Sequence, residues 1–284
     1  MKLTSAVGIA GAFCALIPSC AENGQTIFIR QIQAVEAPEC TFNSDVTALT
    51  TPSGFLDMGI ASHYVIHPLV GNQLLSRGEP RQSRAEPNRV LIEGAEVELL
   101  TPSGAAVNLG GGLANPFSVI ATGTIDPTTS ADATYGVTSV EVIPPVVLQA
   151  YRRANFAGAP IGTTLAIHAK IKVFGRTLGN TAVETGPFTY PITVCYGCGV
   201  QVPADAIDST VSSRNCLAPL STSAGGSAQK TICAVGQDAF TDCRVCQGVI
   251  PLCTPCSTDA ECSTMLSPVS GGPARCNTAS FFCE

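Results

Sequence analysis

The chain has 284 residues, of which 45% are apolar, and this share is enough to build a folded core and excludes an intrinsically disordered protein. Only 13% of the residues are charged and the formal net charge is -6, which argues against a nucleic-acid partner because phosphate binding needs a concentrated cationic surface. We therefore expect a folded protein whose surface is made mainly of uncharged polar groups.

The N-terminus has the three parts of a secretory signal peptide. Lys2 supplies a positive charge, residues 6–17 form an apolar run of 12 residues, and small residues follow it up to Cys20. A helix that spans a membrane needs about 20 apolar residues. The run is too short for that, so we predict a signal peptide over residues 1–19 and export of the chain.

Residues 17–20 read Ile-Pro-Ser-Cys and resemble the lipobox of bacterial lipoproteins. The resemblance implies that Cys20 becomes the lipidated first residue and that the lipid holds the protein on a membrane of the cell envelope, the outer membrane. The alternative is ordinary cleavage after Ala21, with Ser19 and Ala21 as the small pair. Cys20 would then be removed, and the protein would be secreted or periplasmic.

Residues 26–194 have the patterns of a β domain. Every second residue from Leu165 to Val173 is apolar, which is typical of a strand with one buried face. Residues 90–99 alternate as well, but the phase changes and predicts a bulge near Gly94. Further strands are predicted over residues 26–35, 60–66, 117–124, 135–143 and 189–195, and one short helix over residues 146–154 after two prolines. These elements predict a mainly β protein, an antiparallel β-sandwich.

The cysteines divide the chain in two. Residues 21–194 contain one cysteine, whereas residues 195–284 contain 11. We predict a β-sandwich domain over residues 20–194 and a loop-rich module over residues 195–284 that is stapled by disulfides. Without Cys14 and Cys20, the 14 cysteines become 12, an even number that can form six disulfides. The cysteines predicted to form them are Cys40, Cys195, Cys198, Cys216, Cys233, Cys243, Cys246, Cys253, Cys256, Cys262, Cys276 and Cys283.

Three cysteine pairs have the spacing Cys-x-x-Cys, which also occurs in zinc and redox sites. A zinc ribbon separates two pairs by about 15 to 20 residues, but the last two pairs here are six residues apart and no histidine follows His168. A thioredoxin-like site places its first cysteine at a helix N-terminus, whereas Cys195 lies between a predicted strand and a glycine-rich loop. We therefore expect ordinary disulfides, with neither a metal nor a cofactor.

Cys40 stands alone in the predicted β domain, so its partner must lie in the C-terminal module. The last predicted strand brings Cys195 and Cys198 to the edge of the sandwich, and terminal strands commonly lie close together. We expect the partner within residues 195–216, with Cys195 or Cys198 as the first choice.

Two further groups of polar residues are candidate sites. His63 and His67 fit a strand, on which they would lie about 13 Å apart, too far to share one metal ion. Four arginines gather in a loop rich in Gly, Pro and Ser, which is typical of a solvated connection but also allows an anion- or acidic-glycan-binding loop. These arginines are Arg77, Arg81, Arg84 and Arg89.

The C-terminus resembles the short cysteine-rich repeats of exported proteins from myxobacteria and their relatives. The matching residues are Cys256, Asp259, Glu261, Cys262, Cys276 and Cys283. With its lipobox and β domain, the whole chain is similar to uncharacterised myxobacterial lipoproteins, a resemblance that implies a location and an architecture but no activity.

The sequence contains no nucleophile elbow, phosphate loop, calcium loop or paired-carboxylate signature. We therefore expect a lipid-anchored cell-envelope protein that is not an enzyme and has a structural or binding role, with the membrane as one partner and a protein or glycan as the other. The alternative is an envelope enzyme or thiol–disulfide exchange protein whose site does not show in the sequence.

Overall fold

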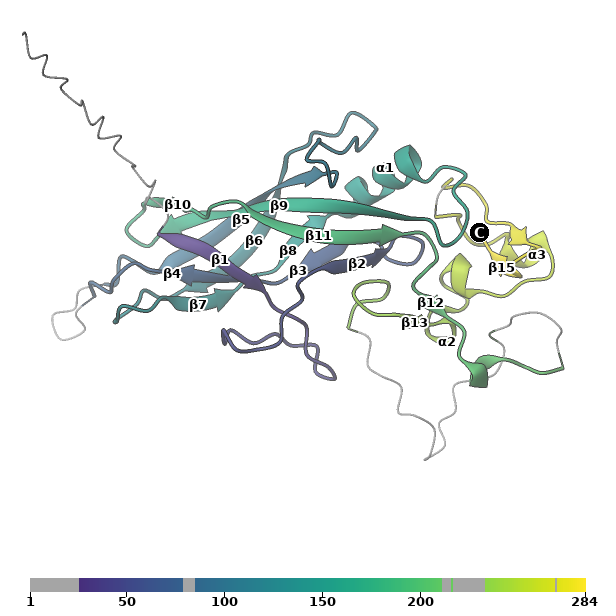
Figure 1. The fold of residues 1–284 in the computed structure, drawn as a ribbon, viewed down its shortest axis with the longest axis horizontal. Helices are drawn as coiled ribbons and strands as arrows, with labels where there is room; N and C mark the ends of the chain where they lie inside the picture. The colour runs from purple at the N-terminus through teal and green to yellow at the C-terminus, as the bar shows by residue number, and fades with distance from the viewer. Residues whose placement is uncertain (1–25, 79–84, 211–215, 217–232, 269) are drawn as a thin grey trace, which may run out of the picture.

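The computed structural model describes residues 26–78, 85–210, 216, 233–268 and 270–284 (Figure 1). Most of their regular structure is β-strand, arranged in layers with a group of disulfide-linked loops at one end (Figure 1). This confirms the predicted mainly β class, an antiparallel sandwich followed by a loop-rich, disulfide-stapled module. Cys20, Arg81 and Arg84 lie outside the described residues.

The larger sheet has the strand order β2-β11-β9-β5-β6, and β10 pairs with part of β9. Its neighbours are antiparallel except β2 and β11, which are parallel. In β9, Ile167, Ala169, Ile171 and Val173 are buried, so the predicted alternation is confirmed from Ile167 on, whereas Leu165 at the start of the strand is exposed. The strands span Gly54–Asp57 (β2), Val90–Leu100 (β5), Phe117–Ile125 (β6), Thr164–Thr177 (β9), Ala182–Glu184 (β10) and Phe188–Cys195 (β11).

The second layer consists of β1 (Ile27–Ile32), β3 (Tyr64–Ile66), β4 (Pro68–Asn72), β7 (Thr134–Val137) and β8 (Val140–Ile143). The strand β4 lies between β1 and β7, and β3 pairs with β8. Ile66 lies opposite Val140, and Leu69 lies opposite Val137, so the two antiparallel ladders continue in one register. Together they form a long strand pair that is interrupted at His67.

The predicted strands differ from the observed ones in their ends. The predicted strand over residues 60–66 begins only at Tyr64, and the one over residues 135–143 is interrupted after Val137. The strands β2, β4 and β10 were not predicted. All five residues of β4 are buried, because β4 is covered on both faces, and therefore it lacks the alternation that reveals a half-buried strand.

The helix α1 (Pro145–Asn155) confirms the one predicted helix. Proline stands at its first position, where a missing N–H leaves no hydrogen bond unmade. Val147, Leu148 and Tyr151 are buried on one side of α1 and join the main hydrophobic core. Among the described residues, no helix combines the length and the apolar character needed to cross a membrane.

The C-terminal module has only short elements between its disulfides. They are β12 (Val200–Gln201), η2 (Ala204–Ala206), β13 (Thr241–Asp242), α2 (Cys243–Cys246), η3 (Pro251–Cys253), α3 (Asp259–Cys262), β14 (Cys276–Asn277) and β15 (Phe282–Cys283). All 12 cysteines predicted to form disulfides do so. The bridges are Cys40–Cys233, Cys195–Cys198, Cys216–Cys243, Cys246–Cys253, Cys256–Cys276 and Cys262–Cys283.

The prediction that Cys40 pairs with a cysteine within residues 195–216 is wrong. Cys40 bonds to Cys233, and Cys195 bonds to Cys198 within its own Cys-x-x-Cys pair. The reason is the position of the two segments: Cys40 is exposed in the long connection between β1 and β2, whereas Cys195 is fully buried at the end of β11. The bridge from Cys40 still joins the β domain to the module, as expected.

Part of the module packs into the sandwich. Leu252 and Cys253 are buried in the same hydrophobic cluster as Leu56 of β2. The Gln237 side chain pairs with the backbone of Val65 in β3, accepting from its N–H at 3.0 Å and donating to its carbonyl oxygen. Residues 233–253 therefore close the end of the sandwich at which β2 and β11 finish (Figure 1).

Candidate functional sites

The described part of the arginine loop is organised around a carboxylate. Glu86 accepts hydrogen bonds from Ser76 Oγ at 2.6 Å and from the backbone N–H groups of Arg77, Gly78 and Asn88. Burial opposes ionisation of Glu86, but these bonds prevail and lower its pKa to about 2. The bonds fix the two ends of the loop together, as in a structural connection.

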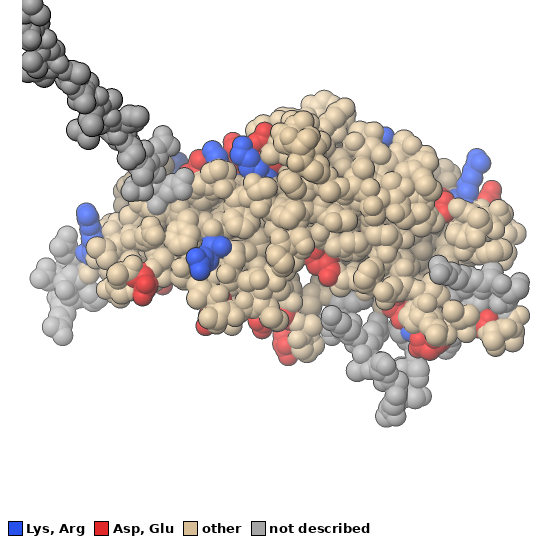
Figure 2. Space-filling model, viewed as in Figure 1, with Lys and Arg blue, Asp and Glu red and all other residues tan. Residues whose placement is uncertain are grey.

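The last arginine of the loop has a partner of its own. Arg89 Nε lies 2.5 Å from Asp126 Oδ1. On the face shown in Figure 2, the Lys and Arg atoms of the described residues lie in small separate groups, several of them beside Asp and Glu atoms. An anion-binding role for the arginine loop stays a hypothesis.

The two histidines of the segment 63–67 have separate surroundings. His63 precedes β3, and its Nδ1 lies 2.9 Å from Ser62 Oγ. The ring of His67 stacks on Phe42 with 4.4 Å between the ring centroids, and its Nδ1 lies 3.0 Å from Ser139 Oγ. Burial lowers the pKa of His67, which favours the neutral imidazole.

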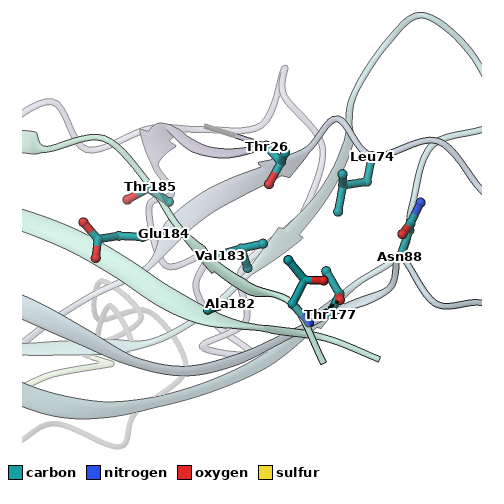
Figure 3. Close-up of a pocket in the computed structure, with 9 residues that line it drawn as sticks. Thr26, Leu74, Asn88, Thr177, Ala182, Val183, Glu184 and Thr185 are labelled. Atoms are coloured by element: carbon teal, nitrogen blue, oxygen red, sulfur yellow. Dashed lines mark hydrogen bonds between the residues drawn. The ribbon is translucent and has the colours of Figure 1, made fainter. Parts of the chain in front are cut away.

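A pocket of about 380 Å³ opens where the start of β1 faces β10 and the end of β9 (Figure 3). Its lining is rich in hydroxyl groups. The lining residues are Thr26, Leu74, Asn88, Thr177, Thr181, Ala182, Val183, Glu184 and Thr185.

The hydrogen-bonding groups of this pocket are mostly uncharged. Glu184 is the one ionisable residue in its lining as far as the structure describes the chain, and its carboxylate pairs with Lys172 Nζ at 3.1 Å. Thr177 Oγ1 accepts from the Thr181 N–H at 3.1 Å, and Thr185 Oγ1 accepts from a backbone N–H of β9 at 3.0 Å. Each hydroxyl keeps its own proton as a donor. The lining therefore offers mainly uncharged polar groups together with one paired carboxylate.

A second hollow of about 430 Å³ lies between the segment 60–63 and the C-terminal module. Three valines of its lining are exposed: Val235 by 38%, Val245 by 38% and Val249 by 80%. The lining of this hollow is largely apolar and includes Cys233 of the Cys40–Cys233 bridge.

A buried carboxylate lies beside the first Cys-x-x-Cys pair. Asp57 ends β2, where it is the register partner of Cys195 at the end of β11. A carboxylate oxygen of Asp57, Cys195 Sγ and Cys198 Sγ lie within 4.8 Å of one another. Asp57 and Cys195 are fully buried, whereas Cys198 is partly exposed.

Backbone N–H groups hold the Asp57 carboxylate. Its Oδ1 accepts from Gly59 and Gly197, both at 2.8 Å, and its Oδ2 accepts from Gly199 at 2.6 Å. The loop after β11 thus wraps around the carboxylate, which explains the glycines: a Cβ on Gly199 would lie 2.9 Å from the Asp57 side chain. Burial raises the pKa of Asp57 in spite of these bonds.

A second carboxylate, that of Asp238, joins the module to the sandwich. Asp238 Oδ1 accepts from the Phe55 N–H and from Tyr64 Oη, each at 2.8 Å. Tyr64 Oη also lies 3.5 Å from Tyr190 Oη. Burial raises the pKa of Asp238 although three hydrogen bonds oppose the shift, and burial likewise raises the pKa of Tyr64.

Sequence patterns did not reveal either carboxylate. Asp57 and Gly197 are 140 positions apart, and only the parallel pairing of β2 with β11 brings them together. The weak signal that exists is local: Asp57 ends a short apolar segment and is followed by Gly59, a spacing that lets a carboxylate bond the backbone two residues on.

No family model, curated protein or solved structure matches the chain. The resemblance to myxobacterial lipoproteins therefore stays a prediction. The candidate sites rest on the geometry and chemistry of this chain alone.

Proposed function

We propose that the chain is an exported cell-envelope protein, anchored by a lipid on Cys20, in which a disulfide-clamped β-sandwich has a structural or binding role. The observation that carries the proposal is the complete pairing of the 12 cysteines after residue 21 into six disulfides. Disulfides in such number form and persist in an oxidising compartment outside the cytoplasm.

The anchor is supported by the leader. The sequence Ile-Pro-Ser-Cys that ends at Cys20 resembles a lipobox. Two or more acyl chains hold a protein stably on a membrane, because each buried methylene contributes about 0.8 kcal/mol. In this arrangement the residues between Cys20 and β1 connect the lipid to the sandwich, and the outer membrane is the proposed location.

The binding role is supported by the uncharged pocket between β1, β9 and β10. Threonine hydroxyls from three segments of the chain line it, and Val183 and Leu74 supply an apolar wall (Figure 3). Pockets that combine an apolar surface with a few fixed polar groups are the usual binding sites of small ligands. We infer that a neutral, hydroxyl-bearing envelope component is the ligand class that this pocket fits.

The proposal is tested by the mass and the location of the mature protein. The Cys20→Ser variant should move from the membrane fraction to the soluble fraction and lose the mass of the lipid, because serine cannot carry the thioether. Cys14→Ser is the matched control, since Cys14 lies in the predicted leader and should not affect either measurement.

The same mass spectra, taken without a reducing agent after thiol alkylation, count free thiols. A structural or binding protein with all its cysteines paired should show none. If Cys20→Ser leaves the fractionation and the mass unchanged, the lipid anchor is wrong; if free thiols occur in the mature wild-type protein, the fully paired scaffold is wrong.

A further inference from the structure

The disulfide between Cys195 and Cys198 differs from the other five in its short loop and in the buried carboxylate beside it. It closes the shortest loop, with a sequence separation of 3, whereas the next shortest, Cys246–Cys253, has a separation of 7. One of its sulfurs belongs to a partly exposed residue, and the carboxylate of Asp57 lies within 4.8 Å of both. Cys216–Cys243 also has a carboxylate within 4.8 Å, but that residue, Asp242, is partly exposed and both cysteines are buried.

The loop that carries this disulfide keeps its shape through other bonds. The Tyr196 N–H donates to the Thr163 carbonyl oxygen at 3.0 Å, and the Gly197 and Gly199 N–H groups donate to Asp57. The Gly199 carbonyl oxygen accepts from the Thr241 N–H at 2.8 Å. Because these bonds do not depend on the S–S bond, the two thiols would stay close together after reduction and could form the bond again.

From this arrangement we propose that Cys195–Cys198 is an exchangeable disulfide that oxidises a partner dithiol, with Asp57 as the proton-transfer group for Cys195. This goes beyond the role proposed above, because it assigns a chemical activity to a site on the sandwich edge. It depends on neither the lipid anchor nor the uncharged pocket.

The exchange proceeds in two balanced steps. A thiolate of the dithiol attacks Cys198 Sγ and forms a mixed disulfide, and Cys195 leaves with the electron pair and takes a proton. The second thiolate of the dithiol then attacks the mixed disulfide, and Cys198 leaves and takes the second proton. The dithiol has become a disulfide, and its two electrons and two protons are on Cys195 and Cys198.

The accessibility of the two sulfurs sets the direction of attack. Cys198 is partly exposed, whereas Cys195 is fully buried, so an external thiolate reaches Cys198 first. The buried sulfur then leaves next to Asp57, away from bulk water. A protonated Asp57 gives it the proton, and the carboxylate takes the proton back when the disulfide forms again.

The direction in which the pKa of Asp57 is shifted agrees with this role. Burial raises the pKa of Asp57, and the charged or titratable groups that face it are Arg152 from α1 and Tyr196 from the loop itself. Arg152 opposes the shift, and burial outweighs it. A raised pKa makes the Asp57 carboxyl a better proton acceptor for the Cys195 thiol than an exposed aspartate would be.

The experiment uses the oxidised, full-length mature protein and dithiothreitol as the dithiol. The protein is incubated with limiting dithiothreitol at neutral pH without denaturant, free thiols are trapped with iodoacetamide, and the alkylated cysteines are located by peptide mass spectrometry. We expect Cys195 and Cys198 to be alkylated at least about tenfold faster than Cys246 and Cys253, the internal control. Equal or slower reduction of Cys195–Cys198 overturns the proposal.

The role of Asp57 has its own readout, the pH profile of Cys195 alkylation in the selectively reduced protein. A neighbouring carboxylate disfavours a thiolate, so Asp57→Asn should shift the profile of Cys195 to lower pH. A structural role alone predicts lower stability with an unchanged profile, and that result overturns the assignment of Asp57. The first assay needs only the wild-type chain and decides on the disulfide even if Asp57→Asn does not fold.

Discussion

Asp238 shows how one hydrogen-bonded carboxyl makes stability depend on pH. Its pKa is raised by burial, so between pH 3.8 and the raised value the folded protein binds more protons than the unfolded chain. The contribution of Asp238 to stability is therefore largest at low pH and falls as the pH rises through this window. The hydrogen bonds from Phe55 and Tyr64 lower the pKa of Asp238 and so reduce this loss of stability, but they do not reverse the upward shift.

We predict that Asp238→Asn changes the free energy of unfolding, relative to the wild type at the same pH, more favourably at pH 7 than at pH 4. The reason is that the amide keeps an oxygen acceptor for Phe55 and Tyr64 and cannot ionise. Urea unfolding at the two pH values measures the change. Asp45→Asn should act in the opposite direction, since hydrogen bonds from Thr47 lower the pKa of Asp45. An unchanged pH dependence in Asp238→Asn would show that this carboxyl carries no net penalty.

At the residue scale, sequence patterns predicted that the 12 cysteines form disulfides, but they did not predict which cysteines pair or which carboxylates lie beside them. The even count and the position of the 12 cysteines were enough to predict full pairing, because parity and compartment decide it. Their partners depend on where loops meet in space, so the partner of Cys40 was wrong. Asp57 gave only the weak local signal of its spacing to Gly59, and Asp238 gave none, because most of the residues that bond them come from distant segments.

At the scale of single elements, the best predicted strands are those that bury one face. The strands β5 and β9 alternate, and the predicted bulge near Gly94 is confirmed by a register shift between Ile92 and Gly94 toward both neighbouring strands. The strand β4 was missed because both its faces are buried, and β2 because four residues are too few to show a period. Burial on two faces and shortness both remove the signal on which prediction depends.

The bulge in β5 also explains why the neighbouring strand β9 has a glycine at position 175. A Cβ on Gly175 of β9 would lie 2.0 Å from the carbonyl oxygen of Leu91, which is backbone and cannot move aside. We predict that Gly175→Ala destabilises the protein by about 1 to 3 kcal/mol, the usual cost of overpacking. Gly123→Ala in β6 is the matched control, because its Cβ would meet ordinary contacts at 3.6 Å.

Urea midpoints of the two variants provide the measurement. The Gly123→Ala variant should stay within about 1 kcal/mol of the wild type, since alanine also lowers the entropy of the unfolded chain. If both substitutions cost the same, the close approach of β9 to β5 at the bulge is not what constrains Gly175.

At the scale of the whole molecule, the C-terminal module has two parts that relate differently to the sandwich. Residues 233–253 complete its hydrophobic core through Leu252 and Cys253 and bond β3 through Gln237. In residues 256–283, four residues form a small separate cluster and the bridges Cys256–Cys276 and Cys262–Cys283 close within the segment, while Phe282 packs with Cys216 and Cys243. The domain boundary at residue 195 stays a prediction, and residues 233–253 share a hydrophobic cluster with the sandwich.

This arrangement gives opposite predictions for two shortened chains. A chain that ends at residue 255 keeps eight cysteines in four complete bridges and the contacts of Leu252 and Gln237, so it should still unfold in one cooperative transition. A chain that ends at residue 206, with Cys40 replaced by serine, loses the partners of Tyr64 and the cover over Gly59 and should lack a cooperative transition. Calorimetry of both chains checks this, and a cooperative transition in the shorter chain would show instead that the sandwich folds without residues 233–253.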